Sequence, residues 1–131
     1  MATNAEAIVA QMTDEFQSLV AYVTGPDAAQ REAYTVELTL FRKLLALGAL
    51  LLHVFFLTRA KARPAAPAQA PDGPVLPYHD RRPTTYYSVF GKLCFARHYF
   101  AAPGRGGRCP LDAALRLPPR CYSDLLREWL G

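Results

Sequence analysis

Apolar residues recur at helical spacing through the first sixty residues of the chain. The first series starts at Ile8 and advances by three or four positions, as expected for one face of an α-helix. Thr3 and Glu6 have the spacing of a capping box, and Gly25-Pro26 marks the end of this helix. The apolar positions of the series are Ile8, Val9, Met12, Phe16, Leu19, Val20 and Val23.

A second, longer helix is predicted from Asp27 to about Ala60, because Asp27 and Gln30 repeat the capping pattern. It carries a broken heptad seam, and its short connection to the first helix predicts that the two pack antiparallel. The seam consists of Ala33, Leu40, Leu47 and Val54, with Val36, Leu50 and Leu57 three positions after three of them.

Residues 44–57 of the second helix are apolar on every side, apart from Gly48 and His53. One neighbouring helix cannot cover all of these faces, so we expect a homodimer through residues 33–57 or burial against something outside the chain. A membrane span is the alternative. It needs about 20 apolar residues, and this run is shorter and flanked by basic residues, which favours a buried helix.

Residues 61–77 contain five prolines among alanines and lack hydrophobic periodicity. Because proline fixes φ and favours polyproline II, this segment is predicted to be a semi-rigid linker. After it, residues 84–90 and 93–100 are rich in β-branched and aromatic residues and flank a turn at Gly91-Lys92, which predicts a β-hairpin with mixed faces. A last helix is predicted from Pro119.

The predicted fold class is therefore α+β. An antiparallel helical pair occupies residues 1–60, a Pro/Ala-rich linker residues 61–78, and a basic module of a β-hairpin and a short helix residues 79–131.

The charge separates the two ends of the chain. Residues 1–57 hold three Lys/Arg against six Asp/Glu, whereas residues 58–131 hold twelve against five. A basic C-terminal half is compatible with a polyanionic partner such as nucleic acid. The odd cysteine count (Cys94, Cys109 and Cys121) and the lack of a secretory leader predict reduced thiols and a cytoplasmic protein.

Four motifs follow one another between residues 40 and 129. They are LFRKLLALGALLL at 40–52, T-x-Y-S-V-F-G-K at 85–92 with R-x-Y-F at 97–100, P-L-D-A-x-L-x-L-P at 110–118, and R-C-Y-S-x-L-L-x-E-W at 120–129. In this order they make the chain resemble the N-terminal part of insertion-sequence transposases of the ISKra class.

The resemblance implies a segment that recognises element DNA and assembles subunits. It also implies that catalysis belongs to a downstream domain in which acidic residues hold divalent metal. No such domain fits after Gly131, so we expect a transposase fragment without catalytic residues of its own. Many relatives carry a Cys-x-x-Cys zinc knuckle where this chain has Ala102 and Arg105, so we expect neither zinc nor another cofactor.

Five arginines are the candidate DNA-contacting residues. Glycines in the loop 104–108 let its backbone and two guanidinium groups approach a phosphate, whereas the simpler interpretation is a flexible turn with solvated or ion-paired arginines. Asp112 is predicted to have a cap or turn role, and Asp124 with Glu128 to form surface ion pairs. The candidates are Arg97, Arg105, Arg108, Arg116 and Arg120.

The sequence thus predicts the N-terminal portion of a DNA transposase. Two alternatives belong to other classes. One is a decayed remnant or a stand-alone interaction protein without a role on DNA, and the other is a small membrane-associated protein that uses residues 44–57. An enzyme acting alone is the least favoured, since a two-metal site needs carboxylates brought together from separate strands.

Overall fold

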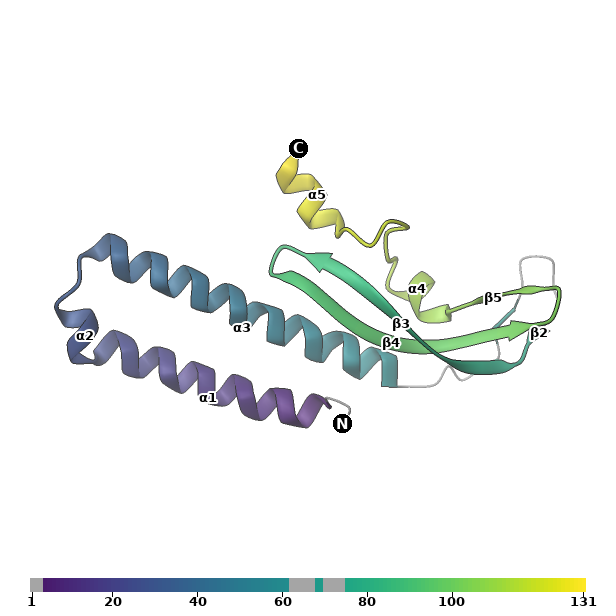
Figure 1. Ribbon diagram of the computed structural model, residues 1–131, viewed down its shortest axis with the longest axis horizontal. Coiled ribbons are helices and arrows are strands. Elements are labelled where there is room, and N and C mark those ends of the chain that lie inside the picture. The colour runs from purple at the N-terminus through teal and green to yellow at the C-terminus, as the bar shows by residue number, and fades with distance from the viewer. Residues whose placement is uncertain (1–3, 62–67, 70–74) are drawn as a thin grey trace. The chain divides into compact units, whose positions relative to one another are not determined.

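The computed structural model describes residues 4–61, 68–69 and 75–131. The fold is α+β, as predicted: long N-terminal helices precede a three-stranded antiparallel sheet and a short C-terminal helix (Figure 1). The chain divides into two compact units, Met1–Phe55 and Phe56–Gly131.

The first helix of the first unit, α1 (Ala5–Thr24), begins one residue later than the capping-box spacing predicts. Asn4 is its N-cap, and its side-chain oxygen accepts a hydrogen bond from the Ala7 amide at 2.8 Å. Thr3, the predicted cap, lies outside the described residues. The helix ends at Gly25, as predicted, and Pro26 opens the next turn.

The predicted single helix from Asp27 is wrong, because two helices occupy that stretch. A short α2 (Pro26–Ala29) is followed by α3 (Ala33–Lys61). Gln30 is the C-cap of α2, and the Asp27 carboxylate accepts from Arg31 at 3.1 Å instead of capping a long helix. The break lets the chain reverse direction in two steps before α3 begins.

Helices α1 and α3 run antiparallel, as predicted (Figure 1). The Lys43 ammonium lies 5.6 Å from the centre of the Tyr22 ring, which identifies the side of α3 that faces α1. On α1, Ile8 and Leu19 are buried, and the heptad seam of α3 from Val36 to Leu57 is half-buried. Lys43 lies seven residues after Val36 and seven residues before Leu50, so it continues the predicted seam. The seam therefore lies on the inner side of the helical pair.

Helix α3 is not buried along most of its length. It is long and apolar enough to cross a membrane, with a mean hydropathy of 1.9 over its most apolar 18 residues, a test that core helices and signal sequences also pass. Only 6% of that window is buried, and the buried residues of α3 are Phe56 and Ala60, so burial of this helix by a second copy or by something outside the chain stays a prediction.

The second unit is built on the sheet β3 (Tyr78–Ser88), β4 (Gly91–Ala102) and β5 (Gly106–Arg108), in that order. The predicted hairpin is present, with Thr85 opposite Cys94, but its turn is formed by residues 89–90 and not by Gly91-Lys92. The Ser88 hydroxyl makes this turn by donating to the Gly91 carbonyl at 2.8 Å and accepting from the Phe90 amide at 3.1 Å.

The segment predicted to be a linker contributes to this unit at its C-terminal end. Strands β1 (Ala68–Gln69) and β2 (Val75–Leu76) pair antiparallel, while residues 62–67 and 70–74 lie outside the described residues. Leu76 is 1% exposed and packs with Phe100, and the Pro77 carbonyl accepts from the Ala101 amide at 3.0 Å. The spacer prediction is wrong here, because Leu76 is part of the core.

The hairpin buries opposite faces at its two ends. Near the turn, Phe95 stacks on Phe56 with ring centres 4.5 Å apart, and Tyr86 meets Phe56 edge-on at 4.9 Å. At the far end Phe100 packs on Leu76. Because side chains alternate along a strand, positions 95 and 100 point to opposite sides, which confirms the predicted mixed faces.

After the sheet come α4 (Pro110–Ala114) and α5 (Asp124–Leu130). The predicted start of the last helix at Pro119 is wrong because residues 121–123 pair with β3: the Tyr87 amide donates to the Cys121 carbonyl at 2.8 Å, and the Ser123 amide donates to the Tyr87 carbonyl at 2.9 Å. Ser123 then caps α5, its hydroxyl accepting from the Leu126 amide at 2.9 Å.

Replacing Phe56 with alanine should lower the free energy of unfolding of the second unit by about 3 kcal/mol, since a buried ring stacked on another is lost and a cavity remains. Chemical denaturation followed by tyrosine and tryptophan fluorescence measures this. Phe90→Ala is the matched control because Phe90 is 38% exposed, and it should cost less than about 1 kcal/mol. Equal effects of the two variants would contradict the packing described for Phe56.

Candidate nucleic-acid interface

The five arginines predicted to contact DNA all lie in the second unit, but in three different settings. Arg105 and Arg108 are exposed on the β4–β5 turn and on β5. Arg116 and Arg120 are exposed on the connection between α4 and α5. Arg97, in the middle of β4, is enclosed, with its side chain 14% exposed.

All three guanidinium nitrogens of Arg97 donate hydrogen bonds within the second unit. Its Nε and Nη2 donate to the two carboxylate oxygens of Asp112 at 2.8 and 3.0 Å, and Nη1 donates to the Arg82 and Pro83 carbonyls, both at 3.0 Å. The hydrogen bond to Asp112 raises the pKa of Arg97, and desolvation opposes it only in part. Arg97 therefore joins α4 to both long strands, and its place is structural.

Asp112 has the predicted turn role through its backbone, since its amide donates to the Cys109 carbonyl at 3.0 Å and its carbonyl accepts from the Leu117 amide at 2.9 Å, but its side chain has a further partner. Its carboxylate forms the fork-to-fork pair with Arg97 from the first turn of α4. Beside this pair, burial raises the pKa of the Cys109 thiol, with Arg97 acting in the opposite direction. Cys109 is therefore a neutral thiol at physiological pH, which does not favour a reactive or metal-bound cysteine.

A hollow of about 370 Å³ lies beside the β4–β5 turn. The Arg82 guanidinium sits 4.0 Å from the centre of the Tyr99 ring, and the His79 ring meets Tyr99 edge-on at 5.7 Å. This is a stacked cation and aromatic pair on an exposed strand, of the type that contacts nucleotides. Its lining consists of His79, Arg82, Tyr99, Ala101, Ala102, Pro103, Gly104 and Gly106.

Asp80 partly balances the positive charge of this hollow. Its carboxylate lies 3.2 Å from Arg82 Nε and 3.3 Å from His79 Nδ1. Desolvation acts to raise the pKa of Asp80, but hydrogen bonds from His79 and Arg82 outweigh it and lower that pKa. The carboxylate therefore stays ionised at neutral pH and orients the Arg82 guanidinium and the His79 ring.

The glycines of the loop 104–108 shape a turn between β4 and β5. Gly104 and Gly106 adopt left-handed φ values of 73° and 69°, which glycine tolerates best. A Cβ on Gly107 would overlap the Tyr99 ring, so glycine is needed for that ring to lie across β5. The loop thereby supports the Arg82–Tyr99 pair, and Arg105 lies between two of the glycines that line the hollow.

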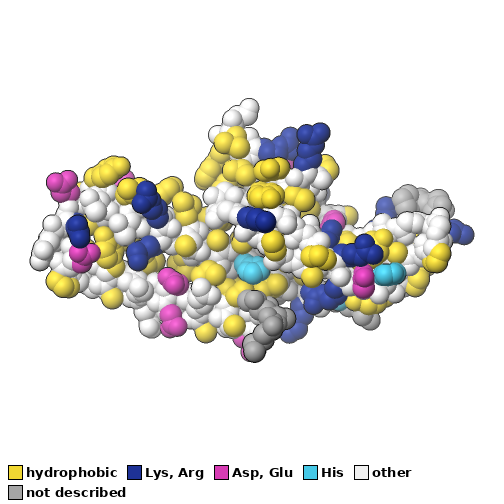
Figure 2. Space-filling view, viewed as in Figure 1, with side chains coloured by type: hydrophobic (Ala, Val, Ile, Leu, Met, Phe, Trp, Pro, Cys, Tyr) yellow, Lys and Arg dark blue, Asp and Glu magenta, His cyan; other side chains and the backbone are white. Residues whose placement is uncertain are grey.

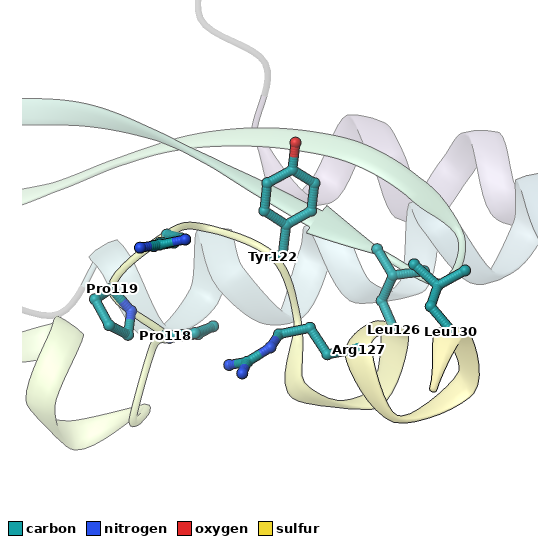
Figure 3. A pocket seen from close by; sticks show the side chains of 7 residues that line it. Pro118, Pro119, Tyr122, Leu126, Arg127 and Leu130 are labelled. Atoms are coloured by element: carbon teal, nitrogen blue, oxygen red, sulfur yellow. The ribbon is translucent and has the colours of Figure 1, made fainter.

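A second groove, of about 460 Å³, lies along α5 (Figure 3). The side chain of Arg127 extends from α5 toward Pro118 and Pro119, and Tyr122 stacks on Tyr87 with ring centres 4.8 Å apart. Arg120 is at its rim. Arg116 and Cys121 nearby adopt left-handed φ values of 51° and 68°. The Arg116 amide donates to the Ala113 carbonyl of α4 at 3.1 Å, and the Cys121 carbonyl accepts from the Tyr87 amide of β3 at 2.8 Å.

Sequence reasoning missed Arg82, His79 and Tyr99. The signal was available, because hairpin register places Asp80 opposite Tyr99 and Arg82 opposite Arg97 once the strand is extended back to Tyr78. The first strand is predicted to start at residue 84, which leaves His79 and Arg82 before the hairpin, whereas Tyr99 lies on the predicted second strand without a binding role. The predicted surface pairing of Asp124 is confirmed, with Arg127 at 3.8 Å.

Figure 2 shows Lys and Arg side chains distributed over the strands and the C-terminal helix of this unit. Within residues 4–61, 68–69 and 75–131, no group of three His, Cys, Asp or Glu residues could hold a metal ion. Comparison of the chain with protein-family models, with curated proteins and with solved structures finds no match.

Replacing Asp112 with asparagine should destabilise the second unit by about 2 kcal/mol, because the enclosed Arg97 guanidinium loses its charged partner. A double-mutant cycle of Asp112→Asn with Arg97→Gln, followed by chemical denaturation, measures the coupling. Asp124→Asn, which removes an exposed pairing partner, is the control and should change stability by less than about 0.5 kcal/mol. Additive effects of the Asp112 and Arg97 substitutions would contradict the linkage.

Replacing Gly107 with alanine should displace the Tyr99 ring and cost about 1–3 kcal/mol, because the new methyl group overlaps an aromatic ring. Proton NMR shifts of the Tyr99 ring and thermal unfolding report the two effects. Combining Gly107→Ala with Tyr99→Ala should recover most of the loss that the methyl group causes. Unchanged ring shifts in the single variant would refute the contact.

Proposed function

We propose that this chain is the N-terminal portion of an insertion-sequence transposase, which binds the ends of its element and brings subunits together. Catalysis is assigned to residues outside this chain. The proposal rests first on the four ordered motifs by which the sequence resembles transposases of the ISKra class. It rests second on the basic surface of the second unit, where exposed cations can neutralise DNA phosphates.

The observation that carries the DNA part is the grouping of cations at one end of the sheet. Arg105 is exposed between two glycines that line the hollow where Arg82 stacks on Tyr99, and Arg108 is exposed on β5, which pairs with the strand that carries Tyr99. Exposed arginines suit phosphate oxygens because the guanidinium forks onto them, and an aromatic ring with a stacked cation suits a base or sugar. Arg97 is not assigned a DNA contact, since its donors are used within the unit.

A stand-alone interaction protein without a DNA role is the second candidate. It is favoured by the exposed apolar side chains of the first unit, which suit a protein partner. The two candidates differ in whether the chain binds duplex DNA and whether that binding weakens with salt.

Fluorescence anisotropy with a duplex of the element's terminal repeat, against a scrambled duplex of equal length, tests the proposal at several salt concentrations. The double variant Arg105→Ala/Arg108→Ala should bind more weakly and reduce the slope of log K against log salt by about 2, since two phosphate contacts are lost. Arg105→Ala/Lys92→Ala removes the same charge, and should reduce the slope by only about 1, because Lys92 is at the other end of the hairpin.

Equal slopes for the two double variants would show that net charge alone governs binding. Equal affinity for terminal repeat and scrambled duplex would remove the recognition of element ends from the proposal. Failure of the unaltered chain to bind either duplex at low salt would favour the interaction-protein candidate.

A further inference from the structure

The helical pair of the first unit leaves an apolar stripe exposed on each of its two long helices. The stripe on α1 is 44–60% exposed and consists of Val9, Phe16, Val20 and Val23. The stripe on α3 is 53–74% exposed and consists of Tyr34, Phe41, Leu44 and Leu51. Large apolar side chains at this exposure on two adjacent helices form an unusually apolar surface for a protein that stays monomeric.

Both stripes have the spacing of helix-packing seams. On α1, positions 9, 13, 16, 20 and 23 advance by alternating steps of four and three, with Thr13 completing the series. On α3, positions 34, 37, 41, 44, 48 and 51 do the same, with Glu37 and Gly48 completing it. Alternating steps of three and four keep a seam on one side of a helix that packs against another.

The two stripes lie on the same side of the helical pair. On α1 the exposed Val9 and Val20 each follow a buried residue, Ile8 or Leu19, by one position. On α3 the exposed Phe41 likewise follows the half-buried Leu40. One position is a rotation of 100° about the helix axis, and the same rotation on two antiparallel helices that face each other leads to one common side.

We propose that this two-helix apolar face binds the same face of a second copy of the chain, forming an antiparallel four-helix bundle. The inner seams join α1 to α3 within each copy, and the outer stripes join the copies. Eight side chains that are each about half exposed offer on the order of 800 Å² per copy, which matches one side of a standard protein interface.

Geometry and charge favour a second copy over other occupants. A face built from two antiparallel helices with matched seams complements itself through a two-fold axis, as in closed dimers. The first unit carries six acidic residues against three basic ones, which disfavours DNA and anionic lipid as its partner.

This inference rests on the assembly part of the proposed function and is independent of DNA binding. The inference also assigns dimerisation to a different side of α3 from the heptad seam identified in the sequence. The seam through Leu40, Leu47 and Val54 faces α1 within the chain, whereas the stripe one position further along is the one that binds the second copy.

Sedimentation equilibrium of the full chain tests the proposal, with far-ultraviolet circular dichroism to confirm that the helices persist. The unaltered chain should be a dimer, and the variant Phe41→Glu should raise its dissociation constant by on the order of a hundredfold, because two carboxylates per dimer lose water without a partner. Phe16→Glu tests the α1 stripe in the same way. Ala46→Glu is the matched control, since Ala46 is exposed on α3 outside the stripe, and it should leave the dimer intact.

A chain that is monomeric at about 100 μM would overturn the proposal, as would a dimer that neither Phe41→Glu nor Phe16→Glu weakens. Larger open assemblies, or a monomer that floats with anionic lipid vesicles, would overturn it in favour of another occupant. These outcomes leave the salt-dependent DNA binding of the second unit to be judged separately, because the arginine variants and the stripe variants alter different units.

Discussion

The ion pair between Arg97 and Asp112 is the interaction on which the second unit depends. One guanidinium group joins three pieces of chain: β4, which carries it, α4, which supplies the carboxylate, and β3, whose two carbonyls accept from it. With α4 fixed, the connection that follows it reaches β3 at Tyr87, and Ser123 can start α5. A planar, fivefold donor suits this task, and lysine could not replace it with one ammonium group.

The sheet then separates two kinds of surface within one small unit. Near its turn the apolar rings of Phe56, Phe95 and Tyr86 pack together, while at its far end Arg82 stacks on Tyr99 beside a glycine-rich turn. A hairpin that buries opposite faces at its two ends can keep a core and an exposed cationic site on the same pair of strands. This arrangement explains why the proposed DNA-contacting residues belong to the far end.

The spacing of apolar residues identified the helices, and a run of β-branched and aromatic residues identified the hairpin. Both are local properties of the chain. The spacing did not identify which seam faces which partner: α3 is apolar all round, and only the contact of Lys43 with Tyr22 identifies the inner side. Local pattern also misplaced the start of the last helix. Pro119 is a good first helical residue, but hydrogen bonds from β3 to residues 121 and 123 prevail there.

Sequence by itself determined the fold class, the uneven charge of the two halves and the motifs that resemble a transposase, since each depends on residue type and spacing alone. Tertiary structure decided what each arginine does. Five arginines of equal chemistry became one enclosed clamp and four exposed cations, because register and burial, which no local pattern encodes, placed Asp112 against Arg97 and left Arg105 in solvent. The same non-local packing brought Arg82 to Tyr99 and placed one α3 seam inside the helical pair and the other outside it.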